Sequence, residues 1–148
     1  MDKKRILVVD DEPSFTHMVK LNLEKLQRYE VGVENDARQT LPTIRRFQPD
    51  LILLDVIMPH LDGGDVVRLL QADVQTRNLP VIFLTAAVQT KEVSQSGGVI
   101  GGQRYLAKPV SLRALVETIE QTLDGGFPAS PPLGSGSVTG LGLTRETP

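Results

Sequence analysis

Three runs of four apolar residues are the most regular feature of the chain. They cover residues 6–9, 51–54 and 81–84, and a polar side chain follows each of them directly. Continuous apolar runs of this length are typical of strands that are covered on both faces, as in a parallel sheet. Weaker apolar patterns at residues 31–33 and 105–106 predict two further strands.

Helical periodicity fills the segments between these strands. Apolar side chains recur three or four positions apart within residues 15–26, 66–70 and 112–123. The first stripe consists of Phe15, Met18, Val19, Asn22 and Leu26, of which one is polar. Asp62 precedes the second stripe and is a suitable N-cap residue, because its carboxylate can accept a hydrogen bond from the first helical turn.

Two segments fit the helical pattern poorly. Pro42 falls inside the second predicted helix, where it would remove a backbone hydrogen bond, so we expect that helix to begin late, near Leu41. A fourth helix over residues 89–96 is weakly apolar and runs into the glycine-rich residues 97–102. We expect this helix to be short or mobile.

Strand and helix alternate five times along the chain. This order predicts an α/β fold in which five helices flank a five-stranded, parallel, doubly wound sheet. In open sheets of this kind, ligands bind beyond the carboxyl ends of the strands. The residues at those ends are therefore the first candidates for function.

Composition divides the chain into two parts. Of the 25 residues from Asp124 to Pro148, 16 are Gly, Pro, Ser or Thr, and no periodic apolar face is present. We therefore expect residues 1–123 to form the folded domain and residues 124–148 to be a disordered tail.

Charge and cysteine content exclude several classes of protein. The 148 residues carry a formal net charge of -2, whereas nucleic-acid-binding domains are typically basic. They include no cysteine for disulfides or thiolate metal sites. No apolar run approaches the ~18 residues of a membrane span, and the first one meets Asp10 at once, unlike a signal peptide. We expect a cytoplasmic protein with neither nucleic-acid nor membrane partners.

Charged and hydroxyl side chains gather at the predicted strand ends. Asp10 and Asp11 follow the first strand, Asp55 the third, Thr85 the fourth and Lys108 the fifth. Because parallel strands end at one edge of a sheet, we expect these side chains to meet there. Three adjoining carboxylates repel one another unless a cation joins them, and oxygen ligands suit Mg²⁺. Mg²⁺ and Lys108 together would neutralise the three carboxylates.

Four short motifs stand at these strand ends in order. They are Val8-Val9-Asp10-Asp11-Glu12-Pro13, Asp55-Val56-Ile57-Met58-Pro59 with Asp62-Gly63, Thr85-Ala86, and Tyr105-Leu106-Ala107-Lys108-Pro109. Together, over residues 4–123, they resemble the receiver domain of bacterial two-component response regulators. The resemblance implies a flavodoxin-like sheet with the strand order 2-1-3-4-5.

The same resemblance implies roles for the acidic residues. Asp55 matches the phosphoacceptor, which takes a phosphoryl group from a phosphohistidine on a sensor histidine kinase or phosphotransfer protein. Asp10 and Asp11 match the acidic pair that holds Mg²⁺, with Asp11 as the direct ligand. Asp55 and the backbone carbonyl of Ile57 match the remaining protein ligands.

The other motifs imply contacts with the phosphoryl group and a response to it. Lys108 matches the lysine that binds the phosphoryl group, and Thr85 matches the hydroxyl that closes on it. Tyr105 matches an aromatic side chain that changes rotamer as Thr85 moves. The bond between Lys108 and Pro109 matches a cis peptide bond, which is rare but attainable before proline.

Simpler interpretations stay open for several residues. Glu12 fits a solvated acid in the first turn of a helix better than it fits a metal ligand. Tyr105 can also simply pack at the edge of the sheet. We expect His17 on an exposed helix face and His60 in a loop, and neither has a second histidine at metal-binding spacing.

The leading hypothesis is a phosphorylation-controlled switch with no enzymatic activity beyond its own phosphorylation and dephosphorylation. We expect no output domain after the tail, so the output would be a contact with another, unknown protein; a homodimer stays open. One alternative is a scaffold that keeps the fold but is not phosphorylated. Another is an Mg²⁺-dependent phosphohydrolase with an aspartate nucleophile, which would need acids spaced Asp-x-Asp after the first strand.

Overall fold

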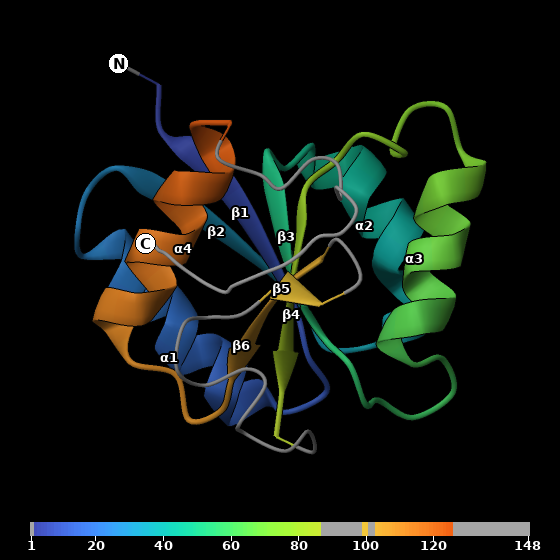
Figure 1. The fold of residues 1–148 in the computed structure, drawn as a ribbon, viewed down its shortest axis with the longest axis horizontal. Helices are drawn as coiled ribbons and strands as arrows, with labels where there is room; N and C mark the ends of the chain where they lie inside the picture. Colours follow the sequence, from blue (N-terminus) through green and yellow to red (C-terminus); the bar gives the residue numbers. More distant parts are fainter. Residues whose placement is uncertain (1, 87–98, 101–102, 126–148) are drawn as a thin grey trace.

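The computed structural model describes residues 2–86, 99–100 and 103–125 and contains one central sheet (Figure 1). Within these residues, the strands lie in the order β2-β1-β3-β4-β6-β5. Their bounds are Lys4–Val9 (β1), Tyr29–Glu34 (β2), Leu51–Asp55 (β3), Val81–Thr85 (β4), Val99–Ile100 (β5) and Gln103–Ala107 (β6). The first four strands and β6 pair in parallel, which confirms the predicted five-stranded parallel sheet and its order, with β6 as the predicted fifth strand.

Strand β5 is an addition that the sequence pattern did not predict. It runs antiparallel to β6, with Val99 opposite Arg104 and Ile100 opposite Gln103. Both residues of β5 are β-branched and suit extended backbone, but two residues are too few to give a periodic signal. The sheet therefore extends one short strand beyond the predicted edge.

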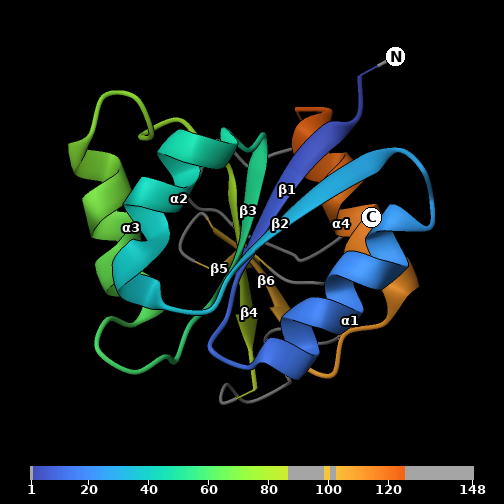
Figure 2. The ribbon, with the colours of Figure 1, turned by 180° about the vertical axis from the view of Figure 1, so that it is seen from behind.

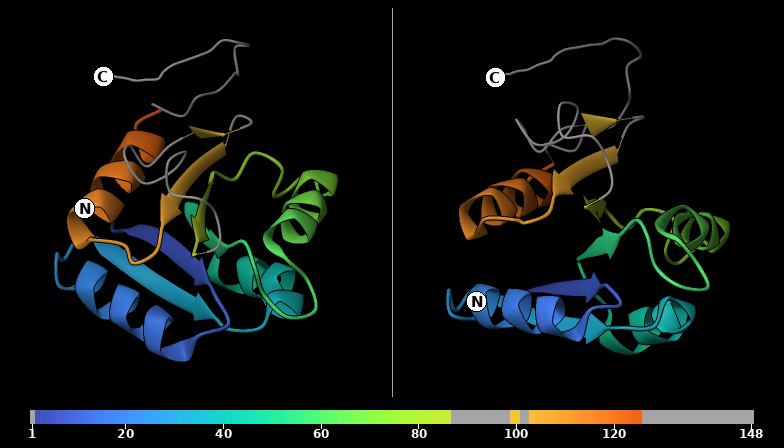
Figure 3. Two further views of the ribbon diagram at one scale, coloured as in Figure 1. Left: turned by 60° about the horizontal axis from the view of Figure 1, so that its bottom comes forward. Right: turned by 90° about the horizontal axis from the view of Figure 1, so that it is seen from below.

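Four α-helices and a short 3-10 helix flank the sheet in the described part of the chain. Their bounds are Pro13–Glu24 (α1), Ala37–Gln39 (η1), Thr40–Phe47 (α2), Gly63–Ala72 (α3) and Leu112–Leu123 (α4). Helices α1 and α4 cover one face and α2 and α3 the other, as Figures 2 and 3 show. The predicted helix over residues 89–96 and nearly all of the predicted tail lie outside the described residues.

The continuous apolar runs arise because the central strands are buried on both faces. In β1, Ile6 and Val8 point into the core beneath α1 and α4, while Leu7 and Val9 point into the core beneath α2 and α3. All four side chains are fully buried. A strand buried on one face alone would show alternating apolar and polar residues.

Two helix starts agree with the sequence analysis. Helix α2 begins at Thr40, so Pro42 lies in its first turn, where a missing N–H removes no helical hydrogen bond. Asp62 is the N-cap of α3: its carboxylate accepts the Asp65 backbone N–H at 2.9 Å, and the Asp65 carboxylate accepts the Asp62 N–H at 3.1 Å. This reciprocal pair fixes the start of α3 beside the end of β3.

The buried face of α1 differs from the predicted stripe. Thr16, Val19 and Leu23 are the buried residues, whereas Met18 is 42% exposed. The Thr16 hydroxyl donates to the Pro13 carbonyl at 3.1 Å, so this polar side chain can be buried with its hydrogen bond made. The hydrophobic pattern could not identify a threonine as part of the core.

Side chains of α1 bind the outer edge of β2. Alternate residues along β2, beginning with Arg28 just before it, turn their backbone groups toward β1. The Lys4 N–H, for example, donates to the Arg28 carbonyl at 3.1 Å. Val31 turns its backbone the other way: its N–H donates to Glu24 Oε2 at 3.0 Å, and its carbonyl accepts from Lys20 Nζ at 2.7 Å. Lys20 and Glu24 are also an ion pair at 2.9 Å.

Gly63 allows α3 to approach the end of β3, which gives a testable prediction. A Cβ at this position would lie 3.0 Å from the Asp55 carbonyl oxygen and 3.1 Å from the Phe83 ring. We expect Gly63→Ala to lower the free energy of unfolding by about 1–3 kcal/mol, measured by urea denaturation.

The neighbouring Gly64 provides a matched control. A Cβ there meets nothing closer than the Asp62 carboxylate at 3.4 Å. We expect Gly64→Ala to leave the free energy of unfolding unchanged or to raise it by up to about 1 kcal/mol, because alanine favours the helix. Equal losses of stability in both variants would show that the close approach at Gly63 is not the cause.

Candidate functional site

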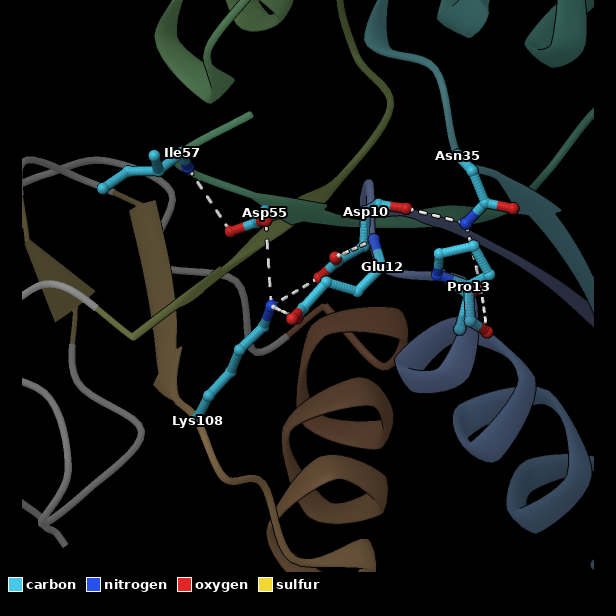
Figure 4. Close-up of polar contacts among 8 residues, drawn as sticks. Asp10, Glu12, Pro13, Asn35, Asp55, Ile57 and Lys108 are labelled. Atoms are coloured by element: carbon cyan, nitrogen blue, oxygen red, sulfur yellow. Dashed lines mark hydrogen bonds and ion pairs between the residues drawn. The ribbon is translucent and has the colours of Figure 1, made fainter. Parts of the chain in front are cut away.

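The carboxyl ends of four strands deliver the predicted site residues to one edge of the sheet. Asp10 follows β1, Asp55 ends β3, Thr85 ends β4 and Lys108 follows β6. Figure 4 shows that Lys108 points toward the acidic side chains from across the strand ends. The parallel topology brings these residues together although as many as 98 positions separate them along the chain.

Three carboxylates form the centre of this site. One oxygen each from Asp10, Asp11 and Asp55 lies within 4.8 Å of the other two. Asp10 is fully buried and Asp55 is 6% exposed, so solvent screens their repulsion poorly. An all-oxygen set of this kind fits a hard divalent cation such as Mg²⁺, which keeps waters besides one or two carboxylates.

Lys108 is the cation of the site. Its Nζ donates to Asp10 Oδ2 at 2.6 Å and lies 3.4 Å from Glu12 Oε1 and 3.7 Å from Asp55 Oδ2. One ammonium against the three central carboxylates leaves two negative charges. A divalent cation would balance these two remaining charges.

The pKa values of Asp55 and Lys108 are both shifted upward. Burial, followed by the charge of Asp10, raises the pKa of Asp55 to about 6, against the weaker opposing effect of Lys108. Burial alone would lower the pKa of Lys108, but its hydrogen bond to Asp10 and the charges of Asp10 and Asp55 together raise it. Lys108 is therefore a fixed positive charge near neutral pH.

A cavity of about 320 Å³ opens above these groups. It is lined by Asp11, Glu12, Asp55, Ile57, Ala86 and Lys108. Asp10 does not line the cavity, and its carboxylate accepts the hydrogen bond from Lys108 at 2.6 Å. The carboxylates at the cavity are thus those of Asp11, Glu12 and Asp55.

The remaining predicted residues lie around this centre. The Ile57 N–H donates to Asp55 Oδ1 at 3.3 Å, and the Ile57 side chain is 60% exposed at the cavity. Thr85 is buried, and its carbonyl accepts the Lys108 N–H at 2.9 Å. Tyr105 does not line the cavity, and its ring centroid lies 5.0 Å from that of Phe83. The Lys108–Pro109 bond is cis, as the resemblance implies.

Sequence reasoning missed two neighbours of the site. The Asn35 side chain donates to the Asp10 carbonyl at 2.8 Å and to the Thr16 hydroxyl at 3.0 Å. It directly follows β2, so the strand-end argument could have found it. Phe15 lies with its ring centroid 4.4 Å from Lys108 Nζ, a contact that no periodicity predicts. His17 is exposed on α1 and His60 is in a loop, as expected.

Comparison with known proteins decides which family this arrangement belongs to. Residues 6–120 match the family described as the response regulator receiver domain. The chain belongs to this family. A relative, the DNA-binding response regulator MtrA of Mycolicibacterium smegmatis, is 36% identical to this receiver over 121 residues, which cover 82% of this chain and 51% of that protein. The receiver thus spans about half the length of the curated relative.

Solved structures agree with this assignment. A putative response regulator from Chloroflexus aurantiacus superposes with a TM-score of 0.70 at 27% identity and covers 83% of this receiver and 99% of that chain. The Vibrio cholerae chemotaxis protein CheY4 superposes with a TM-score of 0.68 at 28% identity and covers 80% and 98%. The comparisons confirm the predicted family and fold and identify a signalling module of two-component systems. Within the described residues, no helix is both long and apolar enough to cross a bilayer.

Proposed function

We propose that Asp55 is the phosphoacceptor of this receiver and that a histidine kinase or phosphotransfer protein is its donor. The main support for this proposal is the position of Asp55 at the cavity. Its carboxylate lies beside those of Asp10 and Asp11 and 3.7 Å from the Lys108 ammonium. A carboxylate in this setting has both a route to the donor and a nearby positive charge for the arriving phosphoryl group.

The proposed transfer is a displacement at phosphorus. An Asp55 carboxylate oxygen attacks the phosphorus of a phosphohistidine, the phosphorus–nitrogen bond breaks, and an acyl phosphate forms as the histidine nitrogen takes a proton. With a pKa of about 6, Asp55 is largely ionised near neutral pH and can act as the nucleophile. Lys108 reaches the new phosphoryl oxygens with a charge-assisted hydrogen bond.

Asp10, Asp11, Asp55 and the Ile57 carbonyl are the residues that would hold Mg²⁺. The bound cation supplies charge neutralisation for the phosphoryl oxygens and the acidic cluster. Asp11 is the accessible carboxylate of the acidic pair, whereas Asp10 is fully buried and hydrogen-bonded to Lys108. This division supports Asp11 as the direct ligand and Asp10 as the group that orients Lys108.

Thr85 and Tyr105 are the proposed responders to phosphorylation. Thr85 is the last residue of β4 and its backbone is bonded to Lys108, which ties it to the phosphoryl-binding side chain. Tyr105 lies directly opposite Phe83 in the sheet register, and Phe83 precedes Thr85 by two residues in β4. The phosphoryl group can change the conformation only by the difference in its interaction energy with the two states.

The output partner of this receiver stays a prediction. MtrA is described as a DNA-binding response regulator, but this chain spans only about half of that protein's length. The expectation of no nucleic-acid partner rests on the near-neutral charge of the residues present. We propose a protein partner at a cytoplasmic location, where kinases of two-component systems deliver phosphoryl groups.

The proposal is tested by incubating the protein with phosphoramidate or acetyl phosphate, with and without Mg²⁺, and measuring its intact mass. We expect one phosphoryl adduct that requires Mg²⁺ and is absent in Asp55→Asn. Asp50→Asn is a suitable control, because Asp50 lies at the opposite end of β3 and accepts the Arg5 N–H. If neither donor gives an adduct with the wild-type protein, the unphosphorylated scaffold is the correct alternative.

A further inference from the structure

The Lys108 ammonium contacts four groups that bear on its orientation. Three are carboxylates: Asp10, Glu12 and Asp55. The fourth is the ring of Phe15 in the first turn of α1, whose centroid is 4.4 Å from Nζ. An ammonium within about 6 Å of an aromatic centroid is attracted by the negative face of the ring.

The position of Phe15 is fixed independently of Lys108. Pro13 occupies the first position of α1 and presets the backbone there, and the Phe15 N–H donates to the Glu12 carbonyl at 3.1 Å. The Phe15 ring also packs against the core beneath α1 and α4. It is therefore a fixed surface for the flexible lysine.

Unlike the three carboxylates, Phe15 keeps its contact with Lys108 when a cation binds at the site. Asp10 and Asp55 would share their charge with a bound divalent cation, which weakens their attraction for Lys108. The Glu12 side chain is 63% exposed, so solvent screens its pairing with the ammonium. Phe15 carries no charge and ligates no metal, so its contact persists.

We propose that Phe15 is a positioning residue that keeps the Lys108 ammonium directed into the cavity through a cation–π contact. The inference rests on the proposed phosphorylation of Asp55. Without the ring, the four rotatable bonds of Lys108 leave more orientations available when the carboxylates are engaged by the cation. Lys108 then reaches the phosphoryl group less often, and transfer slows.

The first test uses protein labelled with ¹³C at its lysines, without Mg²⁺ or donor. A ring current displaces protons that lie over an aromatic face, so the Lys108 Hε signal is expected upfield of the other lysine signals. Lys108→Arg assigns that signal by removing it. Phe15→Leu should return it to the ordinary range, whereas Phe15→Tyr should keep it displaced. An undisplaced Lys108 signal in the wild-type protein would refute the contact.

The second test measures the rate of adduct formation with saturating phosphoramidate and Mg²⁺. We expect Phe15→Leu to lower the maximal rate by about three- to ten-fold and Phe15→Tyr to restore it, because only the ring attracts the ammonium. The Mg²⁺ concentration for half-maximal rate should change by less than about two-fold, because Phe15 donates no ligand to the cation.

Phe47→Leu is the matched control for this test. Phe47 also lies beneath a cation, with Arg5 at 4.2 Å from its centroid, but at the opposite end of the sheet. It should leave the rate unchanged. A wild-type rate in Phe15→Leu would overturn the inference. If the wild-type protein forms no adduct, only the phosphoacceptor role is contradicted, because the lysine signal is measured without phosphorylation.

Discussion

Replacing Lys108 by Met is expected to lower the free energy of unfolding by about 3–5 kcal/mol near pH 7 without Mg²⁺, because two buried carboxylates then lose their positive partner. Asp10 is fully buried and accepts the 2.6 Å hydrogen bond from Lys108, and the Asp55 side chain is only 8% exposed. Neither can recover hydration without opening the end of the sheet. Urea denaturation of wild type and variant measures the difference.

Lys25→Met is the control for this prediction. Lys25 is exposed just beyond α1, so the same substitution there should change the free energy of unfolding by less than about 0.5 kcal/mol. Adding Asp55→Asn to Lys108→Met should restore part of the loss, because it removes one of the unpaired charges. If Lys108→Met proves as stable as Lys25→Met, the ion pair between Lys108 and Asp10 does not stabilise the fold.

Asp55→Asn alone is expected to act in the opposite direction and to raise the free energy of unfolding by about 2–3 kcal/mol near pH 7 without Mg²⁺. The pKa of Asp55 rises from 3.8 to about 6 in the folded protein, chiefly through burial and then through Asp10. The folded state therefore holds this proton more tightly than the unfolded state. Wild-type stability falls as pH rises through this interval, and an uncharged Asn avoids the loss.

The sign of this effect makes it sensitive to pH and to cations. Below the unfolded pKa of 3.8, Asp55 is protonated in both states, so the gain from Asn disappears. Saturating Mg²⁺ should stabilise the wild-type protein more than Asp55→Asn, because the wild-type site retains all three carboxylates. Unfolding curves near pH 3 and pH 7 test the pH dependence, and curves near pH 7 with and without Mg²⁺ test the effect of the cation, with Asp124→Asn as an exposed control. A gain of the same size at both pH values would contradict an ionised, repelled Asp55.

The central strands could be predicted from the sequence because each buried strand is apolar along its whole length. Edge elements lack that signal. Strand β5 has two residues, and its antiparallel pairing depends on the position of β6 rather than on any local pattern. The buried face of α1 was misassigned because a hydrophobic pattern weighs Met18 above Thr16, whereas the folded helix buries Thr16.

The charged centre of the site was predictable for a topological reason. Parallel strands end together, so Asp10, Asp55 and Lys108 could be placed at one edge before any contact was known. Which carboxylate Lys108 binds most closely could not be predicted, since that depends on side-chain rotamers. The same holds for Phe15, because the cation–π contact joins residues 93 positions apart, and nothing local to Phe15 distinguishes it from an ordinary core side chain.

The pair of α1 side chains on β2 has a consequence for how this receiver meets other molecules. An open strand edge is a template for a strand from a second chain. At β2, such a strand would need the outward N–H and carbonyl of Val31, and both are already bound by Glu24 and Lys20. Sheet-to-sheet association along this edge therefore requires these two hydrogen bonds to be broken first. Side chains of α1 therefore oppose aggregation through this strand edge, while its first turn contributes Phe15 to the contact with Lys108.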